Sequence, residues 1–175
     1  MLNTAALCLD YCQKLMAGEV PSPPVAQLIG MNMADVRPGC VVIELEAGKR
    51  HASPLGTVHG GILCAIADAA MGLAYATTLK ETETFATVEL KINFLRPVWQ
   101  GRLRAEGKVI SSGRNLGLGE CDVIDQDQRL IARRISTCIT LRGEQAKADN
   151  GNSKRTNFFK RRLDNGNAAR HKRDW

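Results

Sequence analysis

The sequence predicts a single α+β domain in which one long central helix is wrapped by a curved antiparallel sheet of about six strands. Residues 61–79 form an apolar run with one charge, Asp68, which is typical of a helix buried on every side. Residues 84–141 then alternate apolar and polar side chains over four long segments, which is typical of antiparallel strands with a polar outer face. A chain of 175 residues is long enough for one such core but not for two.

The residues before the long helix predict one further helix and two short strands. Residues 3–16 carry apolar side chains at helical spacing, and Gly18 and a proline-rich run over 21–24 end this segment. We therefore expect residues 1–26 to be an N-terminal helix and a proline-rich linker. Short strands are expected over 28–36 and 40–47, with a turn at residues 37–39.

Four longer strands are expected after the helix, over 84–97, 102–110, 116–124 and 130–141, and the folded domain is expected to span 27–144. Strict alternation divides each strand into an inner and an outer face. The residues expected to share the apolar face are Val88, Leu90, Ile92 and Phe94 in the first of these strands, and Ile131, Ile135, Ile139 and Leu141 in the last.

The net charge of +6 belongs entirely to the C-terminal tail. Residues 145–175 carry nine Lys and Arg and three Asp, so the rest of the chain is neutral. The tail has too few apolar residues to build a core, and we expect it to be disordered. Its basic clusters suit non-specific phosphate binding, but no recognised motif accompanies them, so no specific nucleic-acid partner is expected.

The six cysteines form no CxxC pair, and Cys8 and Cys12, four residues apart, have no histidine nearby to complete a metal site. We therefore expect free thiols, no metal and a reducing compartment. The N-terminus has no basic start before its apolar stretch. Asp68 at the middle of the long apolar segment disfavours insertion into a membrane. These features predict a soluble, cytoplasmic protein that does not bind membranes.

Candidate chemistry begins at His59-Gly60-Gly61, directly before the long helix. The first N–H groups of a helix have no partners within it and lie at the positive end of its dipole. The two glycines carry no Cβ, so a ligand can approach these N–H groups closely. A carbonyl oxygen held there would be polarised, as acyl transfer requires. The two glycines alone favour the simpler interpretation, a tight turn into the helix.

Asp68 makes a catalytic site more plausible, since none of its neighbours on the helix surface pairs with a carboxylate. Those neighbours are Cys64, Ala65, Met71 and Gly72. A desolvated carboxylate is costly, and such groups are concentrated at functional sites. Gly60 lies eight residues before Asp68, or about 12 Å along a helix axis. The two therefore cannot act on one carbonyl within a chain, and a shared site requires a two-fold dimer.

These residues together resemble a known family. The motif HxxPxGxVHGG over residues 51–61, the Asp nine residues after His59, and a later strand ending in NFLRP at 93–97 resemble the hotdog-fold acyl-CoA thioesterases, in particular the phenylacetate-degradation-type branch. The resemblance covers about residues 27–142. It implies an enzyme that hydrolyses an acyl-CoA to the free acid and coenzyme A, without a cofactor, as a homodimer or a dimer of dimers.

The resemblance also implies roles for individual residues. The Gly60 N–H would bind the thioester carbonyl, which His59 would help to position, and Asp68 of the facing subunit would act as nucleophile or general base. Thr87 matches a position that orients the attacking water, although strict alternation places it on the polar face. Ser53 matches a position where many relatives have Asn, and this departure favours an alternative, a non-catalytic acyl-CoA-binding or degenerate hotdog dimer.

Substrate contacts are expected at Gly61 and at two loop arginines, Arg96 and Arg114, whose guanidinium groups suit the phosphates of coenzyme A. A third interpretation is a hotdog acyl-thioester dehydratase or hydratase, in which His59 and Asp68 would pair across the dimer. Release of a free thiol distinguishes hydrolysis from both alternatives.

Overall fold

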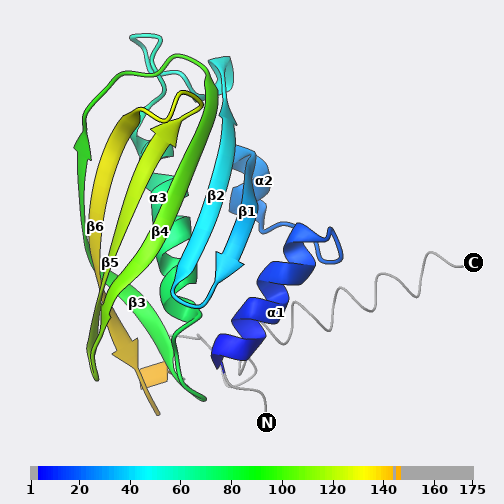
Figure 1. The fold of residues 1–175 in the computed structure, drawn as a ribbon, viewed down its shortest axis with the longest axis vertical. Helices are drawn as coiled ribbons and strands as arrows, with labels where there is room; N and C mark the ends of the chain where they lie inside the picture. The colour runs from blue at the N-terminus through cyan, green and yellow to red at the C-terminus, as the bar shows by residue number, and fades with distance from the viewer. Residues whose placement is uncertain (1–3, 144, 147–175) are drawn as a thin grey trace, which may run out of the picture.

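The computed structural model describes residues 4–143 and 145–146, and it has the expected α+β architecture. Six antiparallel strands form one curved sheet in the order β1-β2-β4-β5-β6-β3, and the long helix α3 lies against its concave face (Figure 1). The elements are α1 (Thr4–Met16), α2 (Pro24–Ile29), β1 (Met31–Arg37), β2 (Cys40–Ala47), the 3-10 turn η1 (Lys49–His51), α3 (Gly60–Ala76), β3 (Thr84–Phe94), β4 (Gly101–Ser112), β5 (Leu116–Asp125) and β6 (Leu130–Leu141).

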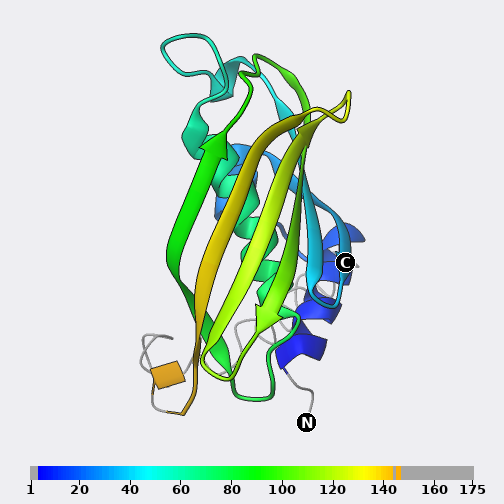
Figure 2. The same cartoon turned by 60° about the vertical axis from the view of Figure 1, so that its left-hand side comes forward.

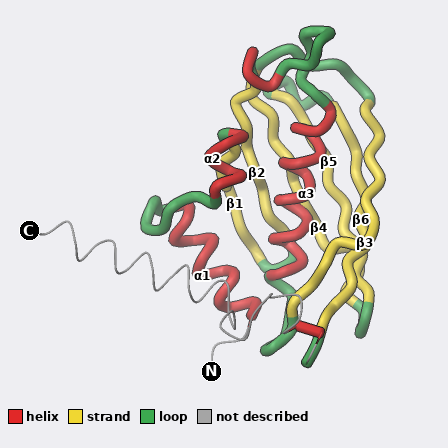
Figure 3. Tube along the Cα trace, turned by 180° about the vertical axis from the view of Figure 1, so that it is seen from behind, coloured by secondary structure: helices red, strands yellow, loops and turns green. Residues whose placement is uncertain are grey.

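Helix α3 lies very close to the middle of the sheet, as the view from behind shows (Figure 3). A Cβ atom on Gly107 of β4 would lie 2.6 Å from the backbone oxygen of Ala70, and one on Gly117 of β5 would overlap the Tyr75 ring. Only glycine fits at these two points. Four of the eight buried residues of α3 are alanines (Ala67, Ala70, Ala74 and Ala76), which helps the helix to approach the sheet closely at these glycines.

The structure reverses the face expected for β6. Its inner face carries Ala132, Arg134, Ser136, Cys138 and Thr140, all of which are buried. Three of the isoleucine and leucine residues expected inside, Ile135, Ile139 and Leu141, lie on the outer face instead, and Ile135 is 42% exposed. The space beside α3 admits small or polar side chains, whereas Ile131 is buried at the start of the strand.

Two helices precede the sheet, and one of them was not expected. Helix α1 packs its apolar side against the C-terminal part of α3, burying Leu7, Cys8, Tyr11 and Cys12. The six-residue helix α2 occupies the start of the segment predicted as a strand over 28–36, so that β1 begins only at Met31. The predicted boundary between residues 26 and 27 falls inside α2.

Strand β3 forms one edge of the sheet, and among the described strands it pairs only with β6 (Figure 2). A β-bulge interrupts this pairing between Thr87 and Glu89, leaving Val88 as the extra residue. Thr87 lies opposite the buried Cys138, and cross-strand partners point to the same face. The bulge therefore turns Thr87 inward, and Val88, which was expected inside, is 57% exposed. Leu90, Ile92 and Phe94 follow on the inner face as expected.

Three further expectations concern the whole chain. The basic tail was expected to be disordered over 145–175. Its first two residues, 145–146, are described as helical and Ala146 is buried, whereas residues 147–175 lie outside the described residues. All six cysteines have free thiols. None of the helices in the described part of the chain is long and apolar enough to cross a membrane.

Candidate active site

His59 is the N-cap residue of α3. Its Nδ1 accepts a hydrogen bond from the Gly61 N–H at 2.9 Å. In a neutral ring this bond places the proton on Nε2, so the exposed side of His59 presents a donor. The Gly61 N–H, expected to contact substrate, is already engaged by this cap.

The neighbouring Gly60 N–H is the available donor at this end of α3. It makes no hydrogen bond within the described residues, as expected for the first residue of a helix. A Cβ on Gly60 would lie 2.8 Å from the ring of Phe94 at the end of β3. The structure therefore brings together an unpaired N–H, a histidine donor and an aromatic ring at the N-terminus of α3.

The loop before α3 is held by His51 and Ser53. His51 is 4% exposed, and its Nδ1 accepts from the Gly48 N–H while Nε2 bonds the carbonyl of Ile29 at 2.8 Å. The Ser53 hydroxyl lies 3.3 Å from that of Thr57 and accepts from the N–H of Leu55. Ser53 thus serves its own turn in this structure, and it makes no contact with the α3 N-terminus among the hydrogen bonds of the described residues.

Asp68, in the middle of α3, has a partner that the sequence did not predict. One oxygen, Oδ1, accepts from Nη2 of Arg134 at 3.4 Å across the gap between α3 and β6. The Asp68 side chain is 51% exposed, whereas that of Arg134 is only 1% exposed. The expectation of a desolvated, unpaired carboxylate is therefore wrong for this chain by itself, because the desolvated member of the pair is the cation.

One side of α3 remains uncovered around Asp68. Gly61 and Asp68 are exposed, and Ala65 and Gly72, at helical spacing from them, are partly exposed. The adjacent edge strand β3 also exposes apolar side chains, including Val88 at 57% and Phe94 at 54%. The opposite side of α3 is buried against the sheet and α1. An apolar helix with one open side next to an open strand edge has the form of an interface.

Thr87 contributes to a small polar group on the inner side of β3 and β6. Its hydroxyl lies 3.9 Å from the Cys138 sulfur, which is also 3.9 Å from the hydroxyl of Ser136. Burial raises the pKa of the Cys138 thiol, the two hydroxyls oppose this rise, and the charge of Asp68 adds to it. Thr87 and Asp68 therefore influence the same thiol, although no hydrogen bond joins them directly among the described residues.

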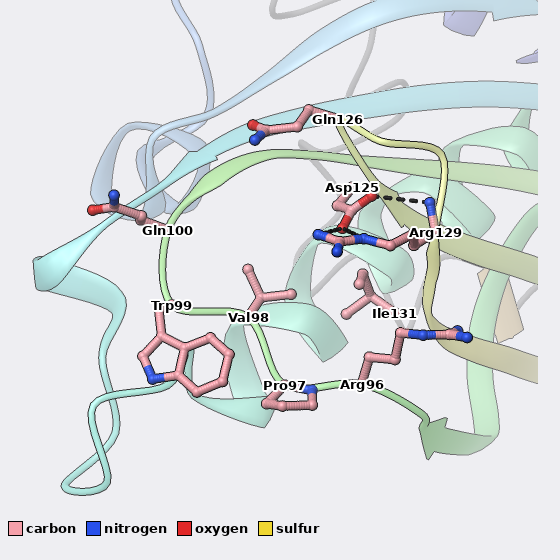
Figure 4. Close-up of a pocket in the computed structure, with 9 residues that line it drawn as sticks. All are labelled: Arg96, Pro97, Val98, Trp99, Gln100, Asp125, Gln126, Arg129 and Ile131. Carbon is pink, nitrogen blue, oxygen red and sulfur yellow. Dashed lines mark hydrogen bonds and ion pairs between the residues drawn. The ribbon is translucent and has the colours of Figure 1, made fainter.

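Arg96 lines a pocket of about 360 Å³ between the β3–β4 connection and the β5–β6 turn (Figure 4). Its Nη1 donates to the carbonyl of Leu130 at 2.9 Å. Trp99, which is 59% exposed, lies across the pocket, and Arg129 is held there by an ion pair to Asp125 at 2.7 Å. The pocket combines an aromatic ring with guanidinium groups.

Arg114 lines a different pocket, of about 470 Å³, with Lys80 and Arg142. This pocket adjoins the end of β6, whereas Arg96 adjoins its beginning. The twelve residues of β6 span roughly 36 Å. The two arginines expected to bind coenzyme A therefore cannot bind the same phosphate group within one chain.

The structure thus divides the predicted residues into four groups. His59, Gly60 and Gly61 lie at the start of α3, Ser53 lies in the loop before it, Asp68 and Thr87 lie near the middle of the α3–β3 side, and Arg96 and Arg114 lie at opposite ends of β6. Sequence reasoning missed Arg134 because it assigned the wrong face of β6 to the core. Within residues 4–143 and 145–146, no group of three or more His, Cys, Asp or Glu side chains is arranged to hold a metal ion.

Comparison with known proteins defines the class as thioester hydrolases. The sequence model of the thioesterase superfamily matches residues 55–132 of this chain, which include the start of α3, Asp68 and Thr87. The solved structure of a phenylacetic acid degradation-related protein from Ralstonia eutropha is 30% identical, covers 74% of this chain and 98% of its own, and superposes with a TM-score of 0.65.

Two curated relatives are also similar over most of their lengths. A protein of Saccharolobus solfataricus, whose name proposes that it is an esterase, is 32% identical over 67% of this chain and 84% of its own. The 1,4-dihydroxy-2-naphthoyl-CoA hydrolase of Listeria monocytogenes is 26% identical over 64% of this chain and 89% of its own. The chain belongs to the thioesterase superfamily, has the hotdog fold and resembles its phenylacetate-degradation-type branch.

Proposed function

We propose that this protein is an acyl-CoA thioesterase, with its active site shared between two copies of the chain. The Gly60 N–H of one copy polarises the thioester carbonyl, and the His59 Nε2–H helps to hold it. Asp68 of the other copy attacks the carbonyl carbon or activates a water that does so, and Thr87 orients that water. The carbon–sulfur bond breaks and the thiolate of coenzyme A leaves. Attack by water gives the free acid directly, whereas attack by Asp68 gives an acyl–Asp68 anhydride that a water molecule then hydrolyses to release the acid and restore the carboxylate.

The observation that carries this proposal is the uncovered side of α3. Asp68 lies there among small side chains, next to the exposed edge of β3. The unpaired Gly60 N–H is about 12 Å away along the same helix, too far for both to reach one carbonyl. A second copy seated on the open side covers the apolar surface and can supply the missing half of the site.

Mixed dimers test the shared site directly. Asp68→Asn removes the reacting charge, and Gly60→Ala places a methyl group where the carbonyl must approach. The Phe94 ring next to Gly60 is half exposed and can move, so the second variant is expected to fold. Each variant alone should keep only a small residual activity, whereas heterodimers contain one intact site and should recover up to about half of wild-type activity. Demonstrated heterodimers without activity would contradict the shared site.

A non-catalytic acyl-CoA-binding dimer is the second candidate, because the Ser53 hydroxyl is engaged in its own turn. A panel of aliphatic and aromatic acyl-CoAs, followed by free thiol release, separates the two functions. Binding without thiol release would favour the second candidate, and hydration of an unsaturated acyl-CoA would favour a hydratase.

Arg96 and Arg114 are proposed to bind the nucleotide part of coenzyme A. Arg96→Ala and Arg114→Ala should each raise KM for an acyl-CoA but not for the matching acyl-pantetheine, which lacks the nucleotide phosphates. A variant that changes KM equally for both substrates does not contact the nucleotide.

A further inference from the structure

Arg134 is the most unusual side chain of the core. Its side chain is 1% exposed on the inner face of β6, and its Nε has no hydrogen-bond partner. A buried cation costs free energy, and replacing a buried ion pair with apolar residues of similar size is often neutral or stabilising. Packing alone therefore does not explain an arginine at this position.

The contacts of Arg134 converge on one turn of α3. Nη1 donates to the backbone carbonyl of Cys64, and Nη2 donates to Oδ1 of Asp68 at 3.4 Å. The Cys64 carbonyl lies one helical turn before Asp68, and within the helix it also accepts the hydrogen bond from the Asp68 N–H. The planar guanidinium therefore holds both the backbone and the side chain at the position of the carboxylate.

The electrostatics also connect Arg134 with Asp68. Burial lowers the pKa of the Arg134 guanidinium, and the charge of Asp68 is the largest influence that opposes this. Asp68 is the only carboxylate paired with Arg134 among the described residues. The other oxygen, Oδ2, makes no hydrogen bond within them, so one oxygen is fixed and the other is available.

We propose that Arg134 is a positioning residue for Asp68, holding Oδ1 so that Oδ2 meets the thioester or the attacking water. The inference rests on the proposed thioesterase function. Arg134 is buried behind α3 and does not itself reach the substrate. Its contribution is to limit the rotation of the Asp68 side chain. Without this contact, a half-exposed carboxylate on the open side of a helix would rotate freely.

Two substitutions and a matched control test this role. Arg134→Met keeps much of the length and removes the charge, whereas Arg134→Lys keeps the charge and loses the planar fork. Arg133→Met is the control, since Arg133 directly precedes Arg134 in β6 but pairs with Asp122 on the outer face at 2.6 Å. For wild type and variants, kcat and KM are measured with one acyl-CoA, and unfolding is followed in urea.

The expected result is a division between kcat and KM. Arg134→Met should lower kcat at least tenfold with KM within twofold of wild type, since binding is unchanged and alignment is lost. Arg134→Lys should have a kcat at least threefold higher than that of Arg134→Met. Arg133→Met should leave kcat and KM within twofold of wild type. The double variant Asp68→Asn/Arg134→Met should be no slower than Asp68→Asn alone, because both changes remove the same interaction.

Several outcomes would overturn the proposal. Wild-type kcat in Arg134→Met, a change in KM alone, or losses that multiply in the double variant would each show that Arg134 does not act through Asp68. If Arg134→Met does not fold, the folded Arg134→Lys variant replaces it in the test. A wild-type kcat in that variant, or a kcat and a KM that change by the same factor, would also show that Arg134 does not act through Asp68. A wild-type chain that releases no thiol from any acyl-CoA would refute the thioesterase function itself, which is a different result.

Discussion

Gly107→Ala should separate α3 from the sheet and thereby disturb the site that α3 carries. A methyl group on Gly107 would lie 2.6 Å from the Ala70 oxygen and the Met71 nitrogen, whereas ordinary contacts begin at 3.4 Å. Helix and strand must therefore move apart by about 0.8 Å, and both contacting groups are backbone. Overpacking of this kind costs about 1–3 kcal/mol.

The matched control is Gly48→Ala, since a methyl group there meets nothing within 4 Å and its φ of −161° is ordinary extended backbone. Both variants stiffen the unfolded chain equally, by about 0.4–1 kcal/mol, so the difference between them isolates the overpacking. Gly107→Ala should melt roughly 2–12 °C below the control. It should also lose kcat, because Asp68 lies two residues before Ala70 and an error near 1 Å can cost about 100-fold.

Thermal unfolding and thiol release measure the two effects in the same preparations. Equal melting temperatures for Gly107→Ala and Gly48→Ala would refute the close contact between α3 and β4. A melting temperature that falls while kcat is unchanged would show that the position of α3 on β4 does not determine the position of Asp68.

Three further predictions concern stability and reactivity. Tyr75→Phe should lower the free energy of unfolding by about 1–2 kcal/mol in urea, because the Thr140 hydroxyl loses a buried partner at 2.7 Å. Glu83 should stabilise the fold above pH 4.5: burial raises the pKa of its carboxyl, but a backbone N–H and the Arg142 guanidinium outweigh this and hold it below 4.5. Its contribution is lost as the pH falls through that lowered pKa, so wild type and Glu83→Gln should converge in acid, and a constant difference down to pH 3 would contradict this. Cys121 should resist a thiol reagent until the chain unfolds, since it is fully buried and burial raises its pKa to about 12; labelling at the rate of a free thiol would contradict its burial.

Local sequence patterns predicted those helices and strands whose own residues show a clear periodicity and clear end signals. The last strand was expected over 130–141 and spans those residues, because turn residues bound it on one side and alternation continues through it. Helix α2 had a signal that was interpreted as part of a linker. Pro24 occupies its first turn and Gly30 ends it in the left-handed conformation with φ 81°, the arrangement typical of a short helix.

The faces of β3 and β6 depend on contacts that no local pattern contains. In β6, apolar residues occur at both odd and even positions, so the pattern alone does not choose a face. The structure places Ile135 and Ile139 on the outer face and Arg134 on the inner face, where it bonds the Cys64 carbonyl and Asp68 of α3. In β3, the inward direction of Thr87 depends on a bulge that shifts the pairing by one residue. Asp68 could be proposed as a site residue from its helix alone, but its partner could not.

The two halves of the sheet also differ in how freely their inner-face residues can be substituted. On β4 and β5, glycine backbones touch α3, and almost any larger side chain would push the helix away. On β3 and β6, the inner face holds hydroxyls, a thiol and partly exposed apolar side chains that only sparsely contact α3. Inner-face positions of β3 and β6 other than Thr87 and Arg134 can therefore be varied in a library to search for altered acyl selectivity of the proposed thioesterase, while the glycine contacts preserve the scaffold through every round.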